Sequence, residues 1–215
     1  IHKQSPDITM IQEVDEDSRR SYHINQVEKL GKAMDGSEYS YARNYKAAFV
    51  PYPIPPLGKM DSGIMTISRL KANSAKRVSL PVSFTWPVRT VNLKRCLLIS
   101  RTKVKGTGKE LVYINLHLEA YDKGAGKKAQ TRALNRILKQ EAAKGNYVIA
   151  AGDFNQTFNN VDTNEYKVQK GLWKPGIIDI SEYDSSLNFV MDSTTPTCRS
   201  LDRPLKGANK SKFQY

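Results

Sequence analysis

Residues 147–156 read Y-V-I-A-A-G-D-F-N-Q, an apolar run that gives way at once to a glycine, an aspartate, a phenylalanine and an asparagine. The apolar part, residues 147–151, predicts a buried strand. Gly152 marks its end, after which Asp153 and Asn155 bring a carboxylate and an amide out of the core. Catalytic side chains commonly converge at the ends of strands on a rigid sheet. This stretch therefore predicts both a core strand and part of a site.

Two earlier stretches combine apolar runs and polar residues in the same way. Residues 7–14, D-I-T-M-I-Q-E-V, predict a strand that closes on Glu13. Residues 111–118, L-V-Y-I-N-L-H-L, predict a strand interrupted by Asn115 and His117. Turn chemistry alone does not readily account for one short polar insert in each of three strands, so the pattern favours a shared site.

The residue types in these inserts suit hydrolysis of a phosphoester assisted by a metal ion. Glu13 offers the carboxylate oxygen that a hard cation such as Mg²⁺ prefers. Asp153 is suited to orient or deprotonate an attacking water, and Asn155 and His117 are suited to stabilise charge on a phosphoryl oxygen. Taken singly, each residue is explained more simply as a solvated strand end, a core histidine or a turn former. Taken together, they favour the catalytic interpretation.

The remaining patterns predict one α/β domain over residues 1–215. The proline-rich stretch 51–58, P-Y-P-I-P-P-L-G, predicts a loop. The glycine-bearing segment K-G-T-G-K-E predicts a hairpin connection between two strands. Other expected elements are helices over 18–34 and 126–144 and strands over 63–68 and 92–104.

The basic charge is concentrated in the middle of the chain. Of 34 Lys and Arg residues, 16 lie between Lys71 and Lys139, together with only 3 of the 21 Asp and Glu residues. This segment therefore accounts for the whole net charge of +13. Such a field attracts polyanions, including nucleic acid, an anionic membrane surface and phosphorylated small molecules. A solubilising basic surface is the plainer alternative.

The cysteine spacing argues against a zinc site, and the hydropathy argues against a membrane-spanning segment. Cys96 and Cys198 lack zinc-site spacing, and the sequence is compatible with either one disulfide or two thiols. No stretch approaches the roughly 20 apolar residues needed to span a bilayer. Neither feature decides the compartment, so the sequence leaves the localisation open.

Four stretches in their order along the chain resemble the endonuclease/exonuclease/phosphatase superfamily, the DNase I-like fold. They are P-D-I-T-M-I-Q-E-V (6–14), S-G-I-M-T-I-S-R (62–69), I-N-L-H-L (114–118) and G-D-F-N (152–155). The resemblance implies a four-layer α/β/β/α sandwich with its active site at one edge of two packed sheets. It also implies hydrolysis that depends on Mg²⁺, for which Mn²⁺ is an expected substitute.

The resemblance also implies roles for individual residues. Glu13 would be a metal ligand, His117 would contact the scissile phosphate, Asp153 would position the nucleophile or the phosphate, and Asn155 would hold a phosphoryl oxygen. We expect Asn115 and Arg95 to contribute to substrate binding. Arg95 belongs to the basic strand predicted beside the strand that carries His117.

Two departures from the family pattern predict that the fold is incomplete in this chain. Family members begin with a strand that carries a metal-holding asparagine, and they close with an S-D-H-x-P motif whose histidine is the general acid or base. No histidine follows His117, and Asp192 and Asp202 are weak matches for the late aspartate. We therefore expect the first strand and the last strands to be missing.

Several functions remain open at this point. The leading hypothesis is a phosphodiesterase or endonuclease that acts on nucleic acid. The alternatives are a phosphatase or phospholipase that acts on an inositol phosphate, on sphingomyelin or on an anionic lipid headgroup, or a degenerate polyanion-binding module. No obligate protein partner is evident from the sequence.

Overall fold

The computed structural model describes residues 4–34, 36–82, 84–86, 93–121, 124–164, 166–167, 173–192, 194–199 and 213–214. The chain forms two compact units, Ile1–Phe154 and Asn155–Tyr215. The organisation of residues 1–215 as a single domain stays a prediction.

The first unit contains two sheets. One is antiparallel and has the order β1-β3-β2, built from β1 (Ile8–Asp15), β3 (Gly58–Ser68) and β2 (Glu38–Val50). The other has the order β4-β5-β6-β7, built from β4 (Ser74–Ser79), β5 (Cys96–Lys103), β6 (Glu110–His117) and β7 (Tyr147–Asp153). The pair β6–β7 is parallel, and the other two pairs are antiparallel.

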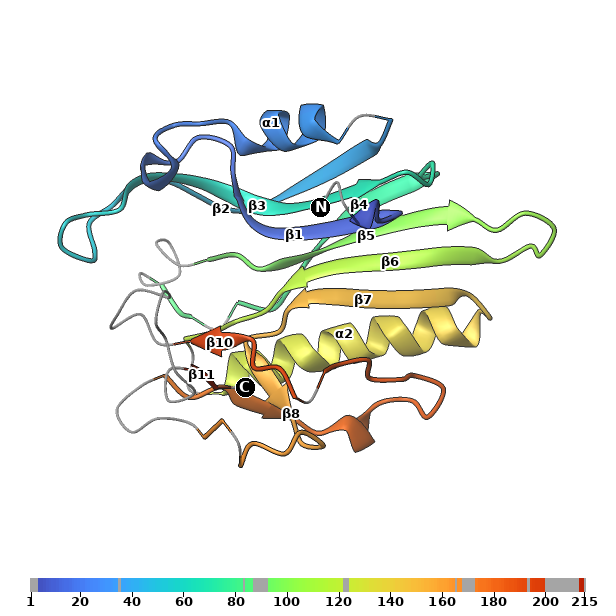
Figure 1. The fold of residues 1–215 in the computed structure, drawn as a ribbon. Coiled ribbons are helices and arrows are strands. Elements are labelled where there is room, and N and C mark those ends of the chain that lie inside the picture. The colour runs from blue at the N-terminus through green and yellow to red at the C-terminus, as the bar shows by residue number, and fades with distance from the viewer. Residues whose placement is uncertain are drawn as a thin grey trace. The chain divides into compact units, whose positions relative to one another are not determined.

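One helix covers the outer face of each sheet (Figure 1). The helix α1 (Gln26–Ala33) lies on the β1-β3-β2 sheet, and α2 (Ala125–Ala143) lies against the sheet that contains β7. The first unit is therefore a four-layer α/β/β/α sandwich, which confirms the predicted fold class.

The alternation of side chains along β3 explains how these layers pack. Met65 and Ile67 point to one face and join a core cluster with Val27 of α1 and with Met34, which directly follows that helix. Ile64 points to the other face, where it meets the second sheet in a cluster with Ala42, Cys96 and Leu98. Burying each large aliphatic side chain contributes about 1.5–3 kcal/mol, so both faces of β3 stabilise the unit.

The helix predicted over 18–34 is wrong in its first half. The short helix η2 (Arg19–Ser21) is followed by Tyr22 and His23, whose φ angles of 54° and 57° are left-handed and interrupt the helical path. The helix α1 then starts afresh, because the Asn25 side chain accepts a hydrogen bond of 3.1 Å from the backbone N–H of Glu28.

The other predicted elements are found with shifted ends, and two strands were not predicted. The expected strands over 7–14, 63–68, 111–118 and 147–151 correspond to β1, β3, β6 and β7, and the helix over 126–144 corresponds to α2. The strand β7 is not the buried core strand that its apolar run predicted, because its residues are half-buried or exposed. The strand expected over 92–104 begins only at Cys96, and residue 92 lies outside the described residues. The hairpin between β5 and β6 is confirmed. The sequence analysis missed β2 and β4.

The second unit contains short elements. A parallel pair is formed by β8 (Gln156–Phe158) and β9 (Gly176–Ile178), followed by η4 (Ile180–Glu182). An antiparallel pair is formed by β10 (Cys198–Arg199) and β11 (Phe213–Gln214). The ring of Phe189 packs edge-to-face on Phe158 and Tyr183, with centroids 5.2 and 5.1 Å apart.

The structure also describes the state of the two cysteines and the hydropathy of the helices. Cys96 and Cys198 are both thiols, so the alternative of a disulfide between them is not realised. In the part of the chain that the structure describes, neither helix is both long and apolar enough to cross a membrane.

Candidate active site

Glu13 owes its position to an irregularity in β1. Ile11 pairs with Met65, but the next paired residue is Val14 opposite Gly63, so between these two pairs β1 has one residue more than β3. Glu13 lies within this bulge at a φ angle of 56°. A bulge re-aims side chains relative to the regular pleat. The Glu13 side chain is 60% exposed as a result.

His117 and Asp153 are neighbours because β6 and β7 are parallel and pair up to their last residues. The Nε2 atom of His117 lies 3.5 Å from Oδ2 of Asp153. This separation is long for a hydrogen bond, so the two groups are juxtaposed rather than tightly bonded. The imidazole is buried, whereas the Asp153 side chain is 48% exposed. The Asp153 carboxylate is therefore accessible to solvent, whereas the neighbouring His117 ring is not.

Burial keeps the His117 ring neutral. Loss of hydration is the main cause that lowers the pKa of His117 to about 3, and the positive charges of Arg95 and Arg20 add to the effect. The ring therefore carries one N–H at neutral pH. Its Nδ1 atom has no hydrogen-bond partner among the described residues.

Gly152 allows β7 to lie this close to β6. Its φ angle is 145°, a conformation that residues with a side chain rarely adopt. A Cβ atom at this position would lie 2.0 Å from the backbone oxygen of Leu116. The glycine of the G-D-F-N stretch is therefore required by the close approach of the two strands beside His117 and Asp153.

Asn115 connects the two sheets. Its side chain is fully buried, and its Nδ2 atom donates to the backbone oxygens of Met65 at 2.9 Å and Ile11 at 3.3 Å. The same nitrogen lies 3.3 Å from Oγ1 of Thr66, and the Oδ1 atom accepts a bond of 2.8 Å from Gln12. These contacts are structural, and they fix the strand of Glu13 relative to the strand of His117. The predicted role of Asn115 in substrate binding stays a prediction.

Arg95 is a buried cation within electrostatic reach of the candidate residues. Its side chain is almost fully buried, and its Nε atom has no hydrogen-bond partner among the described residues. Burial lowers the pKa of the Arg95 guanidinium, and the negative charges of Glu119, Asp153 and Glu13 oppose this shift. An anion that reaches this guanidinium would replace hydration that the group has lost.

Arg20 is a further residue of the site that the sequence analysis did not identify. Its Nη1 atom donates to Oε2 of Glu13 at 3.1 Å, and its Nε and Nη2 atoms both bind the buried carboxylate of Asp15. Burial raises the pKa of Asp15, but hydrogen bonds from Arg20 and Ser62 outweigh this and bring it below its ordinary value. The sequence offered no signal for Arg20, because the segment was expected to be an ordinary helix.

Asn155 and the two weak matches for the late aspartate fall within the range of the second unit. Asn155 opens that unit with a φ angle of 50°, a left-handed conformation that asparagine tolerates. Its grouping with His117 and Asp153 stays a prediction. The carboxylate of Asp192 accepts hydrogen bonds from Thr194 and Thr195, which lower the pKa of Asp192 to about 2 and close a local turn. Asp202 lies outside the described residues.

The donor atoms of the first unit suit a hydrated cation rather than a metal enclosed by protein. Among the described residues, no three His, Cys, Asp or Glu side chains are grouped to hold a metal ion. Mg²⁺ usually retains several waters and binds proteins through one or two carboxylates. The exposed carboxylate of Glu13 fits such a ligand.

Comparisons with known proteins agree with this fold. The sequence profile of the Endonuclease/Exonuclease/phosphatase family matches residues 1–204. No significant match to a curated protein sequence was found.

Three solved structures superimpose on the chain with a TM-score of 0.51. The catalytic domain of human Nocturnin with bound sulfate is 19% identical, and the match covers 73% of this chain and 54% of that chain. An endonuclease/exonuclease/phosphatase from Beutenbergia cavernae is 23% identical, with 63% and 36% covered. A humanized D. rerio TDP2 is 19% identical, with 73% and 55% covered. The match thus spans about a third to a half of these relatives.

Proposed function

Because the chain belongs to the endonuclease/exonuclease/phosphatase family, we propose that it hydrolyses phosphoester bonds and that its substrate is nucleic acid. The observation that carries this proposal is the pairing of His117 with Asp153 at the ends of β6 and β7. Arg95 and Glu13 are the cation and the carboxylate that complete the site.

Each side chain has a part in an in-line displacement at phosphorus. The exposed carboxylate of Asp153 accepts a hydrogen bond from the attacking water and takes its proton. The neutral ring of His117 donates its N–H to a phosphoryl oxygen, and Arg95 offsets the negative charge that develops there. Asn155, the first residue of the second unit, keeps the role that the family resemblance implies for it, that of a donor to a phosphoryl oxygen.

Glu13 is the proposed ligand of a divalent cation, Mg²⁺ or Mn²⁺. When bound, the cation supplies charge that stabilises the phosphoryl oxygens and the leaving group. Glu13 suits this role because its carboxylate is exposed at the end of a strand, where a hydrated ion has access.

The distribution of basic residues favours nucleic acid as the substrate. One ridge of α2 carries four exposed cations with spacings of three or four residues: Lys128, Arg132, Arg136 and Lys139. Residues four apart on a helix lie about 6 Å apart along its axis. The only acidic residue of α2 is Glu141, which is buried and bound to Arg101. The ridge therefore retains its positive charge for a polyanion.

A lipid or an inositol phosphate is the second candidate, favoured by an exposed apolar loop. Tyr52 and Ile54, between β2 and β3, are 77% and 91% exposed, and Phe49 beside them is also exposed. An enzyme that acts on a membrane lipid needs such an element to contact acyl chains.

The deciding experiment incubates supercoiled plasmid with the purified protein and Mg²⁺, with EDTA as one control. We expect nicking that Asp153→Asn reduces at least about 100-fold, as is typical when a general base is removed. Asp7→Asn is the matched control, because Asp7 is an exposed aspartate at the start of β1. An intact plasmid, together with phosphate or headgroup release from a panel of inositol phosphates and sphingomyelin, would support the second candidate. Binding of DNA without hydrolysis of any substrate would indicate a polyanion-binding module.

A further inference from the structure

Arg20 is held from one side by a carboxylate that has no access to solvent. Asp15 is 2% exposed, and both of its oxygens accept hydrogen bonds of 2.9 Å, from Nε and Nη2 of Arg20. Ser62 Oγ lies 3.3 Å from the same Nη2 atom. This two-point contact fixes the plane of the guanidinium and leaves Nη1 directed away from Asp15.

The remaining edge of the guanidinium reaches Glu13. Nη1 donates to Oε2 of Glu13 at 3.1 Å, and this is the one hydrogen bond that the Glu13 carboxylate makes among the described residues. Glu13 is largely exposed and lies in the bulge of β1, so neighbouring side chains do little to restrict its rotation. Arg20 therefore decides where this carboxylate points.

A cation beside a metal ligand would normally oppose binding of a second cation. Asp15 removes this obstacle, because its charge cancels that of Arg20 at contact distance. The pair then acts on Glu13 as a neutral hydrogen-bond donor that orients the carboxylate without competing strongly with a metal ion. Groups that orient a ligand in this way commonly change metal affinity about 10- to 100-fold.

We propose that the Asp15–Arg20 pair is a positioning device that presents the Glu13 carboxylate to a divalent cation. This inference rests on the proposed function, in which Glu13 is a metal ligand. Neither Asp15 nor Arg20 contacts the reacting atoms, so both are positioning residues rather than catalytic ones.

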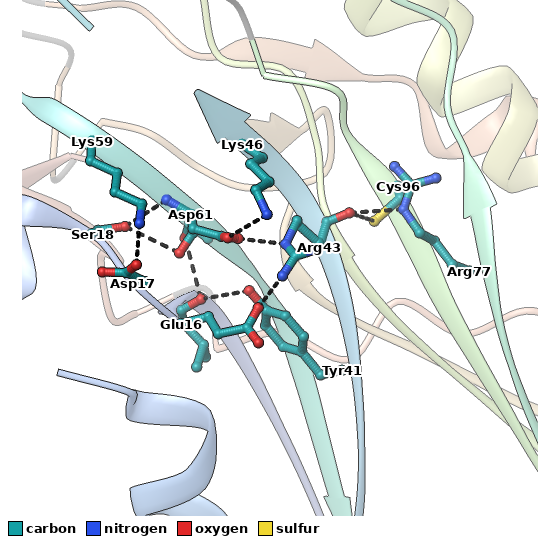
Figure 2. Close-up of polar contacts among 12 residues, drawn as sticks. Glu16, Asp17, Ser18, Tyr41, Arg43, Lys46, Lys59, Asp61, Arg77 and Cys96 are labelled. Carbon is teal, nitrogen blue, oxygen red and sulfur yellow. Dashed lines mark hydrogen bonds and ion pairs between the residues drawn. The ribbon is translucent and has the colours of Figure 1, made fainter. Parts of the chain in front are cut away.

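The same sheet provides a matched control (Figure 2). Arg43 of β2 binds the buried carboxylate of Asp61 through Nε at 2.5 Å and the exposed carboxylate of Glu16 through Nη2. As in Asp15–Arg20–Glu13, one arginine binds one buried and one exposed carboxylate, although Lys46 also lies 3.5 Å from Asp61. It has no described bond to Glu13 or His117. Substitution of Arg43 therefore removes an arginine that binds two carboxylates and leaves the contact of Arg20 with Glu13, the proposed ligand, in place.

The experiment measures the dissociation constant of Mn²⁺ for the whole chain by electron paramagnetic resonance, without substrate. We expect Arg20→Gln to weaken Mn²⁺ binding by about tenfold or more. Arg20→Lys should give an intermediate loss, because one ammonium cannot serve Asp15 and Glu13 with the same geometry. Asp15→Asn should also weaken binding, because it leaves the charge of Arg20 uncompensated. Arg43→Gln should leave the dissociation constant within about twofold, since it lacks the contact that carries the effect.

Glu13→Gln tests the metal-ligand role of Glu13 separately from the positioning role of Arg20. If Glu13→Gln removes Mn²⁺ binding while Arg20→Gln and Arg20→Lys bind as tightly as the wild type, the positioning role is overturned and the ligand role stands. If Glu13→Gln binds Mn²⁺ as the wild type does, the proposed metal site is wrong and the positioning role falls with it. Circular dichroism checks folding, and Arg20→Lys carries the test should Arg20→Gln not fold.

Discussion

His117 and Asp153 occupy the last paired positions of two parallel strands, with Nε2 and Oδ2 3.5 Å apart. The contact depends on the backbone more than on either side chain, because Gly152 lets β7 run against Leu116. The packing of β7 against β6 and the position of Asp153 beside His117 therefore depend on the same backbone atoms of Gly152 and Leu116.

Burial of His117 predicts a specific acid sensitivity. Its pKa is about 3 in the folded protein and about 6.5 in an unfolded chain, so the unfolded state binds the extra proton between these values. The free energy of unfolding should fall as the pH falls below 6.5, by up to about 1.4 kcal/mol per pH unit from this group. His117→Asn should show a shallower decline in urea denaturation between pH 7 and pH 4. Equal slopes for the two proteins would contradict a buried neutral ring.

Substitution of Gly152 should be the most damaging single change in β7. Gly152→Ala places a Cβ atom 2.0 Å from the oxygen of Leu116 and enforces a strained φ angle, so we expect a loss of about 3 kcal/mol or more. Gly145→Ala is the control, because Gly145 also has a positive φ angle but its Cβ would lie 3.7 Å from the nearest atom. That change should cost about 1 kcal/mol. Chemical denaturation of both variants provides the comparison.

Loss of the Asn115 side chain should weaken the contact between the two sheets. Asn115→Ala removes the buried acceptor of the Gln12 side chain and the donor to two backbone oxygens, so we expect a loss of about 2–4 kcal/mol. Asn73→Ala is the matched change, because the Asn73 side chain accepts one exposed bond of 2.8 Å from the backbone of Lys103. It should cost about 1 kcal/mol or less. Similar losses for the two variants would argue against a bridging role.

The basic ridge on α2 should determine how DNA binding responds to salt. Binding of duplex DNA in EDTA should weaken with salt, and substitution of each contacting residue should reduce the logarithmic slope by about one unit. The variant with glutamine at 128, 132, 136 and 139 should therefore show a much flatter slope in fluorescence anisotropy. Lys29→Gln, an exposed change on α1, should leave the slope unchanged. An unchanged slope in the fourfold variant would exclude the ridge as a contact surface.

Some elements were predictable because the local sequence and the packing demand the same structure. The apolar runs of β6 and β7 indicated both strands, and Gly152 indicated where the apolar run of β7 ends. Their burial was not predicted: β6 is buried along most of its length, with Asn115 in structural contacts, whereas the residues of β7 are half-buried or exposed. The helix α2 was predictable for the same reason, since its buried stripe includes Leu134 and Leu138.

Other features arise only from contacts between distant segments. Periodicity across residues 18–34 did not reveal that Tyr22 and His23 adopt left-handed angles. Arg20 joined the site only because the chain folds back at η2 and brings it to Asp15 and Glu13, five and seven positions earlier. No local pattern encodes that return, so the sequence indicated Glu13 but not the arginine that binds its carboxylate.

The extra residue in β1 has a consequence for how this chain tolerates insertions and deletions. Removing one residue between Ile11 and Val14 would restore a regular ladder with β3 and would make β1 a more ordinary strand. The same deletion would abolish the left-handed position that turns Glu13 outward. Under the proposed role of Glu13, a gain in regularity at this point of the chain would therefore cost metal binding, so the number of residues in the bulge should matter as much as their identity.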